Sequence, residues 1–255
     1  MDYAQARMQA RFGERPDESL WQAMVGATQV ESALKIARSS SLARWIAGLD
    51  AASDGHTIEL ALRARWRECV AELASWLPPR WQAAMLWTSM LPDLPALMHL
   101  ARGGAPLDWM RRDPLLQPYA LADDETRIVR LRNEALAFAA PHWEAIIRSK
   151  KSDDANDVRL LAAWRDEWRR RWPRWGDREG FEALARWIDI HLRRPIAGDR
   201  EDALRRLRKL FREVALHPAA AFVYLAFIAL DLSHLRSVLL RWTLIERPLQ
   251  EGTTA

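Results

Sequence analysis

The feature that most constrains this chain is an apolar run that carries one acid. Residues 222–240 read FVYLAFIALDLSHLRSVLL, and the uninterrupted apolar part, from Ala219 to Leu230, ends at Asp231. A helix that crosses a bilayer needs about 20 apolar residues, whereas a run of roughly 10–14 is typical of a buried core helix. His234 and Arg236 follow Asp231 within two turns. The run therefore predicts the central helix of a soluble protein.

The composition predicts helices throughout. The apolar residues are mostly Ala and Leu, the charged ones mostly Arg and Glu, and only 10 of the 255 residues are Gly. No segment alternates apolar and polar residues at period two, as a half-buried strand would. The fold class is therefore predicted to be all-α, in a single domain of residues 1–255.

Helical patterns cover residues 3–12, 19–27, 30–39, 57–77, 80–104, 125–140, 160–172, 180–194 and 201–216. Residues 105–124, which contain three prolines, predict a linker, and residues 149–158 an exposed loop.

The single cysteine predicts a core position and a reducing compartment. Cys69 has no second cysteine to pair with, and it falls in phase with Leu62, Trp66, Leu73 and Trp76 on one helical stripe. The N-terminal residues lack the order of a secretory signal. We therefore expect a cytoplasmic protein in which Cys69 is a small core residue.

A threefold repetition is visible in the order of the helices. Residues 68–100 give a basic amphipathic helix, a proline break and an apolar helix with Asp93, and residues 201–240 repeat this order with Asp231. Residues 173–194 give a third copy with Asp189. Three similar units predict a pseudo-threefold arrangement, and the subdomains are expected at residues 1–104, 105–200 and 201–255.

Sequence motifs for catalysis, metal or cofactor binding are absent. The six histidines are scattered without metal-ligand spacing, and neither a phosphate-binding glycine loop nor a nucleophile elbow occurs. Two acidic clusters, residues 123–125 and Asp153, Asp154 and Asp157, are interpreted as solvated helix caps rather than magnesium ligands. We therefore expect no catalytic residue, no metal and no cofactor.

Basic and aromatic residues raise the alternative of nucleic-acid binding. The net charge is +4 with a pI near 9.6, and residues 164–175 mix Trp with Arg. However, Trp164, Trp168 and Trp172 keep to one stripe, and Asp166 and Glu167 stand four residues before arginines. An aromatic core stripe beside a self-compensated face is the favoured interpretation, so no nucleic-acid partner is expected.

The two acids inside apolar helices predict structural tethers. A carboxylate buried among apolar residues is costly unless it is ionised and paired. Asp93 and Asp231 are therefore each expected to accept hydrogen bonds from a neighbouring arginine or a helix N-terminus.

Both ends of the chain resemble a known family. Tyr3, Arg7 and Arg11 share one face of the first helix, and the apolar helices carry DLPAL at residues 93–97 and DLSHLR at residues 231–236. These features resemble the C subunit, called d in eukaryotes, of V-type and archaeal-type rotary ATPases, in which acid-x-x-Asn-Leu segments close apolar helices. Ala96 and His234 stand where Asn is usual, the resemblance covers both ends but does not extend to the middle region 105–180, and the chain is shorter than a typical member.

The resemblance implies a fold and a role. It implies three similar helical subdomains in a funnel, seated on the cytoplasmic face of the membrane as a peripheral subunit. The partners would be the proteolipid rotor ring and the central-shaft subunits, with membrane contact only through the complex. The function would be non-catalytic torque transmission in ion transport. Tyr3, Arg7, Arg11, Asp93, Asp189, Asp231, His234 and Arg236 would be structural residues.

Three other functions remain open from the residues. The first is a soluble helical-repeat adaptor that binds proteins, and the second is a nucleic-acid-binding protein that uses the basic faces of residues 159–174 and 203–212. A helical enzyme is the third and least favoured.

Overall fold

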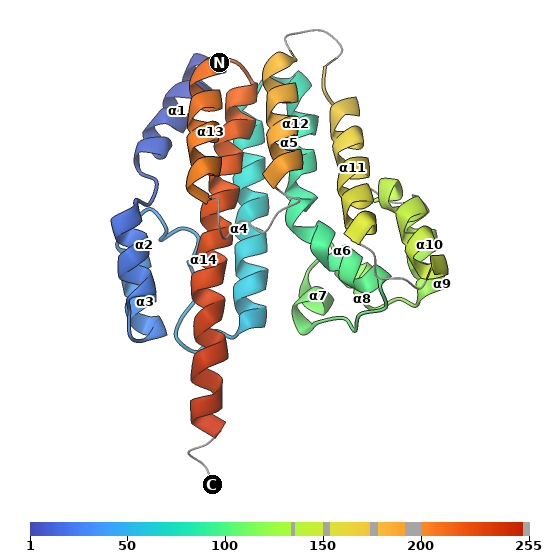
Figure 1. Ribbon diagram of the computed structural model, residues 1–255, viewed down its shortest axis with the longest axis horizontal. Coiled ribbons are helices and arrows are strands. Elements are labelled where there is room, and N and C mark those ends of the chain that lie inside the picture. Colours follow the sequence, from blue (N-terminus) through green and yellow to red (C-terminus); the bar gives the residue numbers. More distant parts are fainter. Residues whose placement is uncertain (134–135, 150–153, 174–177, 192–199, 252–255) are drawn as a thin grey trace. The chain divides into compact units, whose positions relative to one another are not determined.

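The structure is a computed structural model that describes residues 1–133, 136–149, 154–173, 178–191 and 200–251 (Figure 1). Side chains are described for these residues except 146–149, 154–158, 191 and 244–251. The described residues form helices joined by turns, with no strand among them, which confirms the all-α prediction.

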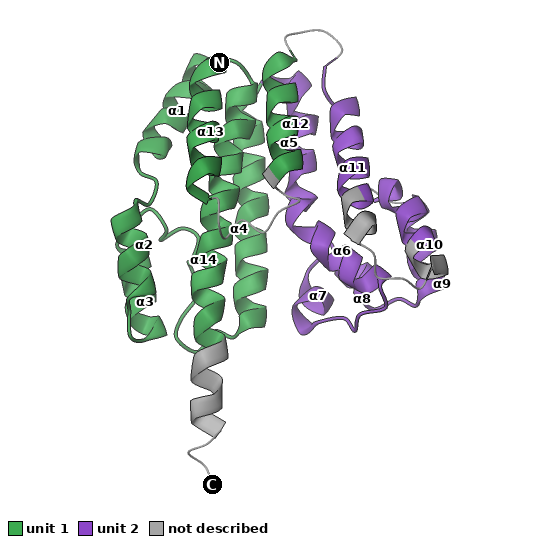
Figure 2. Ribbon diagram, in the orientation of Figure 1, with its two compact units in different colours: residues 1–77, 178–255 green, residues 78–177 purple. Residues whose placement is uncertain are grey.

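The chain divides into two compact units (Figure 2). Unit 1 comprises residues 1–77 and 178–255, and unit 2 comprises residues 78–177. The expected boundaries after residues 104 and 200 fall inside units 2 and 1, respectively. The units differ from the expected subdomains because the last helix of the chain packs against the first ones, so both chain ends belong to one unit.

Unit 1 is built around its last helix. Its helices are α1 (Asp2–Gly13), α2 (Glu18–Val25), α3 (Val30–Arg38), α4 (Gly55–Trp76), α12 (Glu179–His191), α13 (Arg200–Glu213) and α14 (Ala219–Glu251). Helix α14 contacts α1, α4, α12 and α13. The residues from Ala219 to Thr243 are long and apolar enough for a membrane span, yet 61% of their most apolar window is buried. Helix α14 thus packs as the core helix that the sequence predicts.

Helix α4 confirms the predicted apolar stripe. Its start is capped by Asp54, whose carboxylate accepts a hydrogen bond from the Thr57 backbone N–H at 2.7 Å, and it ends before Pro78. Leu62, Trp66, Cys69 and Leu73 are buried, whereas Trp76, the last residue of the helix, is only half-buried. Burial raises the pKa of the Cys69 thiol to about 11. The thiol therefore stays protonated at neutral pH, as expected of a core residue.

Unit 2 has an aromatic core. Its helices are α5 (Pro79–Trp87), η1 (Thr88–Asp93), α6 (Leu94–Ala101), α7 (Asp108–Arg112), α8 (Gln117–Ala120), α9 (Asp124–Asn133), η2 (Ala137–Ala139), α10 (Ala140–Ser149) and α11 (Asp154–Arg170). Trp164, Trp168 and Trp172 are buried in one stripe, with neighbouring ring centroids 5.7 and 5.0 Å apart. The Trp168 indole N–H donates to the Ala84 carbonyl at 3.1 Å, and that of Trp87 donates to the Trp164 carbonyl at 3.2 Å. The stripe joins α11 to α5.

The single helix predicted over residues 80–104 is wrong. The chain forms α5, then the 3₁₀ helix η1, then α6. Pro92 and Pro95 lack the backbone N–H groups that would bond Thr88 and Leu91 in a continuous α-helix, so the helix breaks there. The predicted end at the two glycines is confirmed, because Gly103 has φ +79° and the Gly104 N–H bonds the His99 carbonyl at 2.9 Å.

The linker predicted over residues 105–124 is also wrong, because this segment folds into α7 and α8. Asp113 sets the turn between them by accepting hydrogen bonds from the backbone N–H groups of Leu115 and Leu116, at 2.9 and 3.2 Å. Trp109 and Tyr119 are buried. Pro118 fits because it lies in the first turn of α8, where no intrahelical donor is needed, and Pro106 and Pro114 lie outside both helices.

A matched pair of substitutions tests the central position of α14. Ile228 of α14 is 4% exposed, whereas Ile190 of α12 is 49% exposed. We expect Ile228→Ala to lower the free energy of unfolding by about 2–5 kcal/mol, because it leaves a cavity. Ile190→Ala should cost less than about 1 kcal/mol. Urea unfolding measures both, and equal losses would contradict the core role of α14.

Candidate functional site

Asp231 lies at the centre of an ionic cluster that joins three segments of unit 1. Its carboxylate, 5% exposed, accepts two hydrogen bonds at 2.8 Å from the guanidinium of Arg15, which follows α1. Arg200, the first residue of α13, donates a third at 3.0 Å. The bidentate geometry is the strongest that Arg and a carboxylate form. The cluster is the arginine tether that an acid inside an apolar helix requires.

Aromatic rings pack around the same cluster. The Arg15 guanidinium lies 4.5 Å from the ring centroid of Phe227 and 5.3 Å from that of Phe12. Phe12 in turn packs edge-on to Phe227 at 4.9 Å and stacks on Phe211 at 5.2 Å. Helices α1, α13 and α14 thus meet through rings as well as charges. The side chains of Arg15 and Asp231 are only 12% and 8% exposed, and low exposure to water strengthens their electrostatic attraction.

His234 extends this cluster by one turn of α14. Its ring packs edge-on against Trp21 of α2, with centroids 4.6 Å apart. Burial lowers the pKa of His234, and the positive charge of Arg200 lowers it further, although Glu18 and Asp231 act in the opposite direction. His234 is therefore held neutral at physiological pH. It serves as a packing partner of Trp21.

Arg236 makes a second ionic contact between α14 and the rest of unit 1. Its guanidinium pairs with the buried carboxylate of Glu59 on α4, and Arg63 Nε lies 3.5 Å from the same carboxylate. Glu59 precedes Leu62 by three residues, so it lies in phase with the apolar stripe of α4. An acid within an apolar stripe indicates a buried ionic contact. The sequence shows this pattern at Glu59, but the contact was not identified from the sequence.

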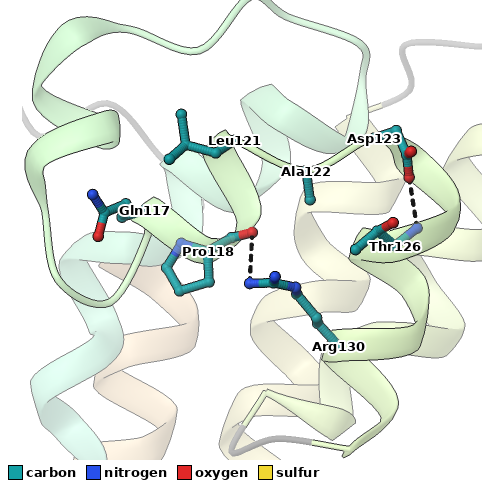
Figure 3. A pocket seen from close by; sticks show the side chains of 7 residues that line it. All are labelled: Gln117, Pro118, Leu121, Ala122, Asp123, Thr126 and Arg130. Carbon is teal, nitrogen blue, oxygen red and sulfur yellow. Dashed lines mark hydrogen bonds between the residues drawn. The ribbon is translucent and has the colours of Figure 1, made fainter.

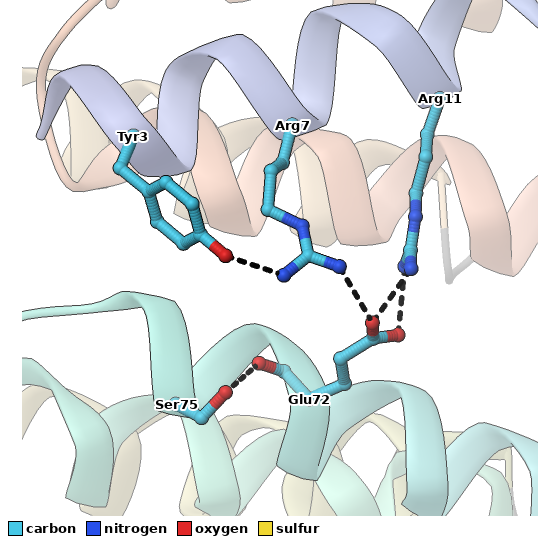
Figure 4. Close-up of polar contacts among 5 residues, drawn as sticks. All are labelled: Tyr3, Arg7, Arg11, Glu72 and Ser75. Carbon is cyan, nitrogen blue, oxygen red and sulfur yellow. Dashed lines mark hydrogen bonds and ion pairs between the residues drawn. The ribbon is translucent and has the colours of Figure 1, made fainter.

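Tyr3, Arg7 and Arg11 form a ladder along α1, as their spacing predicts (Figure 4). Arg7 donates to the Tyr3 hydroxyl at 2.7 Å, and Arg11 donates to both carboxylate oxygens of Glu72 on α4, at 2.7 and 2.6 Å. Both guanidiniums also lie over the ring of Trp76, 4.7 and 4.9 Å from its centroid.

The ladder pairs its two arginines with a single acid. The hydrogen bond from Arg11 is the main cause that lowers the pKa of Glu72. Arg7 lies 3.8 Å from the same carboxylate. Two guanidiniums therefore share one acid, and Tyr3, at the start of the ladder, is 67% exposed.

The remaining two predicted acids lie in different surroundings. Asp93 is 1% exposed at the junction of η1 and α6 in unit 2. Asp189 is half-buried on α12 of unit 1. Asp93 ends a 3₁₀ helix whereas Asp231 lies within α14, so their local structures differ. Among the predicted residues, Asp231 and His234 lie in one cluster. Arg236 joins α14 to α4, and the α1 ladder of Tyr3, Arg7 and Arg11 joins α1 to α4.

The residues that form ion pairs with these predicted residues were not identified from the sequence. Arg15 and Arg200 lie outside or at the very start of helices, where periodicity carries no information. Glu72 stands three residues after Cys69 and four before Trp76, so its place beside the apolar stripe was visible in the sequence. The sequence did not show which of the many arginines would pair with Glu72.

The first acidic cluster caps a helix, as predicted. Asp123 accepts a hydrogen bond from the Thr126 backbone N–H at 2.8 Å, and Asp124 pairs with Arg127 at 2.9 Å. The cluster of Asp153, Asp154 and Asp157 lies outside the described side chains. Within the described residues, no three His, Cys, Asp or Glu side chains gather as metal ligands would.

The outward face of α11 is only partly self-compensated, because four arginines share Asp166 and Glu167, and the pairing differs from the prediction. Glu167 pairs with Arg171 four residues on at 2.9 Å, as expected, and also with Arg170 at 3.2 Å. Asp166 lies 3.7 Å from Arg169, three residues on, instead of pairing with Arg170.

An open hollow of about 590 Å³ lies beside α8 and α9 in unit 2 (Figure 3). It is lined by Gln117, Pro118, Leu121, Ala122, Asp123, Thr126 and Arg130. Arg130 donates to the Pro118 carbonyl at 3.3 Å, and the Asp123 carboxylate is engaged as a helix cap. The polar groups of the hollow thus serve the local fold, and the hollow has no nucleophile paired with a base.

No family model, no curated protein and no solved structure matches this chain.

Removing the Asp231 charge should destabilise the protein strongly. Asp231→Asn leaves Arg15 and Arg200 without their shared acid in a largely buried site, and such a change costs about 3–5 kcal/mol of unfolding free energy. The control is Asp108→Asn, which breaks an exposed 3.3 Å pair with Arg111 and should cost less than about 1 kcal/mol. Chemical denaturation compares the two. A loss for Asp231→Asn as small as that of the control would refute the tether.

His234 should make stability depend on pH. Because its pKa is lowered from the ordinary 6.5 in the folded state, the unfolded chain binds the proton more readily. The contribution of His234 is complete above about pH 6.5 and is lost as the pH falls through the folded-state pKa. We expect the stability difference between wild type and His234→Gln to shrink from about pH 8 to about pH 5. A constant difference over this range would contradict the assignment.

Proposed function

We propose that this chain is a short, divergent member of the C (d) subunit family of rotary ATPases. It would be a non-catalytic central-stalk subunit that couples the central shaft to the proteolipid rotor ring. The observation that carries the proposal is that four residues of the resemblance, Arg7, Arg11, Asp231 and Arg236, form ionic contacts between separate segments of unit 1. Tyr3 supports this set from within α1, where its hydroxyl accepts a hydrogen bond from Arg7.

Such ties suit a part that transmits force. Arg15 and Asp231 are 216 positions apart in the chain, Arg236 and Glu59 are 177 apart, and Arg11 and Glu72 are 61 apart. Each contact therefore fixes segments that are distant in sequence. A body closed in this way resists shear between its helices, because sliding would break directional bonds to buried charges.

Three of the four buried carboxylates among the described residues support a structural role over a catalytic one. Asp231 and Glu59 are matched by arginines, and Asp113 is matched by backbone N–H groups. A general acid or base needs a carboxylate whose pKa is tuned for proton transfer and that faces a substrate site. These three carboxylates are committed to the fold instead.

The proposal includes features that the resemblance alone supplies. These are the pseudo-threefold funnel, the seat on the cytoplasmic face of the membrane, the ring and shaft as partners, and a role in ion transport without a cofactor. In this proposal, the two compact units are both parts of one coupling subunit.

A protein-binding helical adaptor is the second candidate. Leu121 and Val129 of unit 2 and Leu216 of unit 1 are large apolar side chains that are more than half exposed. Exposed apolar residues on an otherwise well-packed protein often mark contacts with partners. This observation fits either candidate, so the identity of the partners decides between them.

The deciding experiment is a pull-down of the tagged full-length protein from gently solubilised membranes of its own organism. We expect mass spectrometry to identify proteolipid ring and stalk subunits in the eluate, and an untagged strain processed in parallel controls for background. Recovery of soluble partners alone would reject the rotary role and favour the adaptor. Recovery of nucleic acid alone would reject both.

A further inference from the structure

Helix α13 has two faces of opposite character. Its apolar residues Ala203, Leu204, Leu207, Leu210 and Phe211 are buried against the rest of unit 1, where α13 packs on α14 (Figure 1). Its outward residues include Arg205, Arg206, Arg208, Lys209 and Arg212, all of them exposed. We call these five residues the α13 basic face.

The positive charge of the α13 basic face is only partly compensated. Asp202 pairs with Arg205 at 3.4 Å and with Arg206 at 2.8 Å, and Lys209 lies 3.8 Å from Glu213. Neither Arg208 nor Arg212 has a carboxylate partner among the described residues. From Arg205 to Arg212 the helix rises only about 10 Å, so the excess charge occupies a short stretch.

An exposed apolar side chain stands at the C-terminal end of this stretch. Leu216, 56% exposed, follows α13 in the turn to α14 and has φ +64°, a left-handed conformation that is unfavourable for leucine. The side chain of the buried Gln5 on α1 accepts a hydrogen bond from the Leu216 N–H at 3.2 Å and holds this turn. The fold thus fixes an apolar side chain in solvent four residues after Arg212, whose charge no described carboxylate matches.

We propose that the α13 basic face and Leu216 together bind an acidic amphipathic helix of a partner protein. Acidic side chains spaced at one helical turn would pair with Arg208 and Arg212, and an apolar residue one turn beyond would pack on Leu216. The inference is independent of the proposed function, since it rests only on the charges and exposure of this surface.

Flanking acids favour a short peptide over a continuous polyanion. Glu201 and Asp202 precede the α13 basic face, and Glu213 follows it. A nucleic-acid strand or an anionic lipid surface carries phosphates without interruption and would place some of them beside these carboxylates. A partner helix can match the sequence of charges residue by residue.

The test places a photocrosslinker in the full-length chain in its own cells, as Leu216→p-benzoylphenylalanine. After irradiation, the crosslinked material is digested and identified by mass spectrometry. We expect a protein segment with Asp or Glu at helical spacing. Crosslinks to RNA, to lipid or to a segment without such acids would overturn the proposal, and so would the absence of any crosslink.

Charge reversal supplies the matched control. Arg208→Glu/Arg212→Glu, combined with the crosslinker, should reduce the crosslink at least about tenfold, because attraction becomes repulsion. Arg111→Glu/Arg170→Glu makes the same change of net charge at exposed positions of unit 2 and should leave the yield within about twofold. Circular dichroism checks that both variants fold. Equal yields from the two double variants would overturn the proposal.

Discussion

The charge of Asp231 is the constraint on which unit 1 depends. An ionised carboxylate inside an apolar helix is tolerated only when donors replace the water it has lost. Here the donors are Arg15, from the segment after α1, and Arg200, from the start of α13. Satisfying one acid therefore brings the beginning and the end of the chain together, and unit 2 is the part of the chain inserted between them.

The two units are stabilised by different means. In unit 2, α11 is joined to α5 by stacked tryptophans and indole hydrogen bonds. In unit 1, α14 is an apolar core helix whose packing is supplemented by arginine–carboxylate ties at Asp231 and Glu59. Apolar packing supplies most of the stability of such a bundle, whereas buried ion pairs are directional and fix which helices meet. Specific closure of this kind would suit the coupling role proposed above. The α13 basic face lies outside these ties, so it can bind a partner without disturbing them.

Local order was predictable from the sequence, and distant partners were not. Periodicity gave the apolar stripe of α4 and the tryptophan stripe of α11, because each depends only on neighbouring turns. The helix break at Pro92 and Pro95 could have been predicted, because proline lacks the backbone N–H group. The continuous apolar pattern on both sides of the break favoured a single helix instead. The short helices α7 and α8 were not predicted, because proline is compatible with the first turn of a helix as well as with a loop. Asp231 was identified as a tethered acid, yet Arg15 and Arg200 could not be chosen among many arginines, because the choice depends on how the helices pack.

Hydrogen–deuterium exchange on wild type and Arg15→Met tests most directly whether the Asp231 cluster closes unit 1. The account predicts that α1 and α14 are protected together in the wild type and that both exchange faster in the variant, while α9 and α11 of unit 2 keep their rates. Fast exchange of α1 in the wild type, unchanged by the substitution while α14 stays protected, would contradict it.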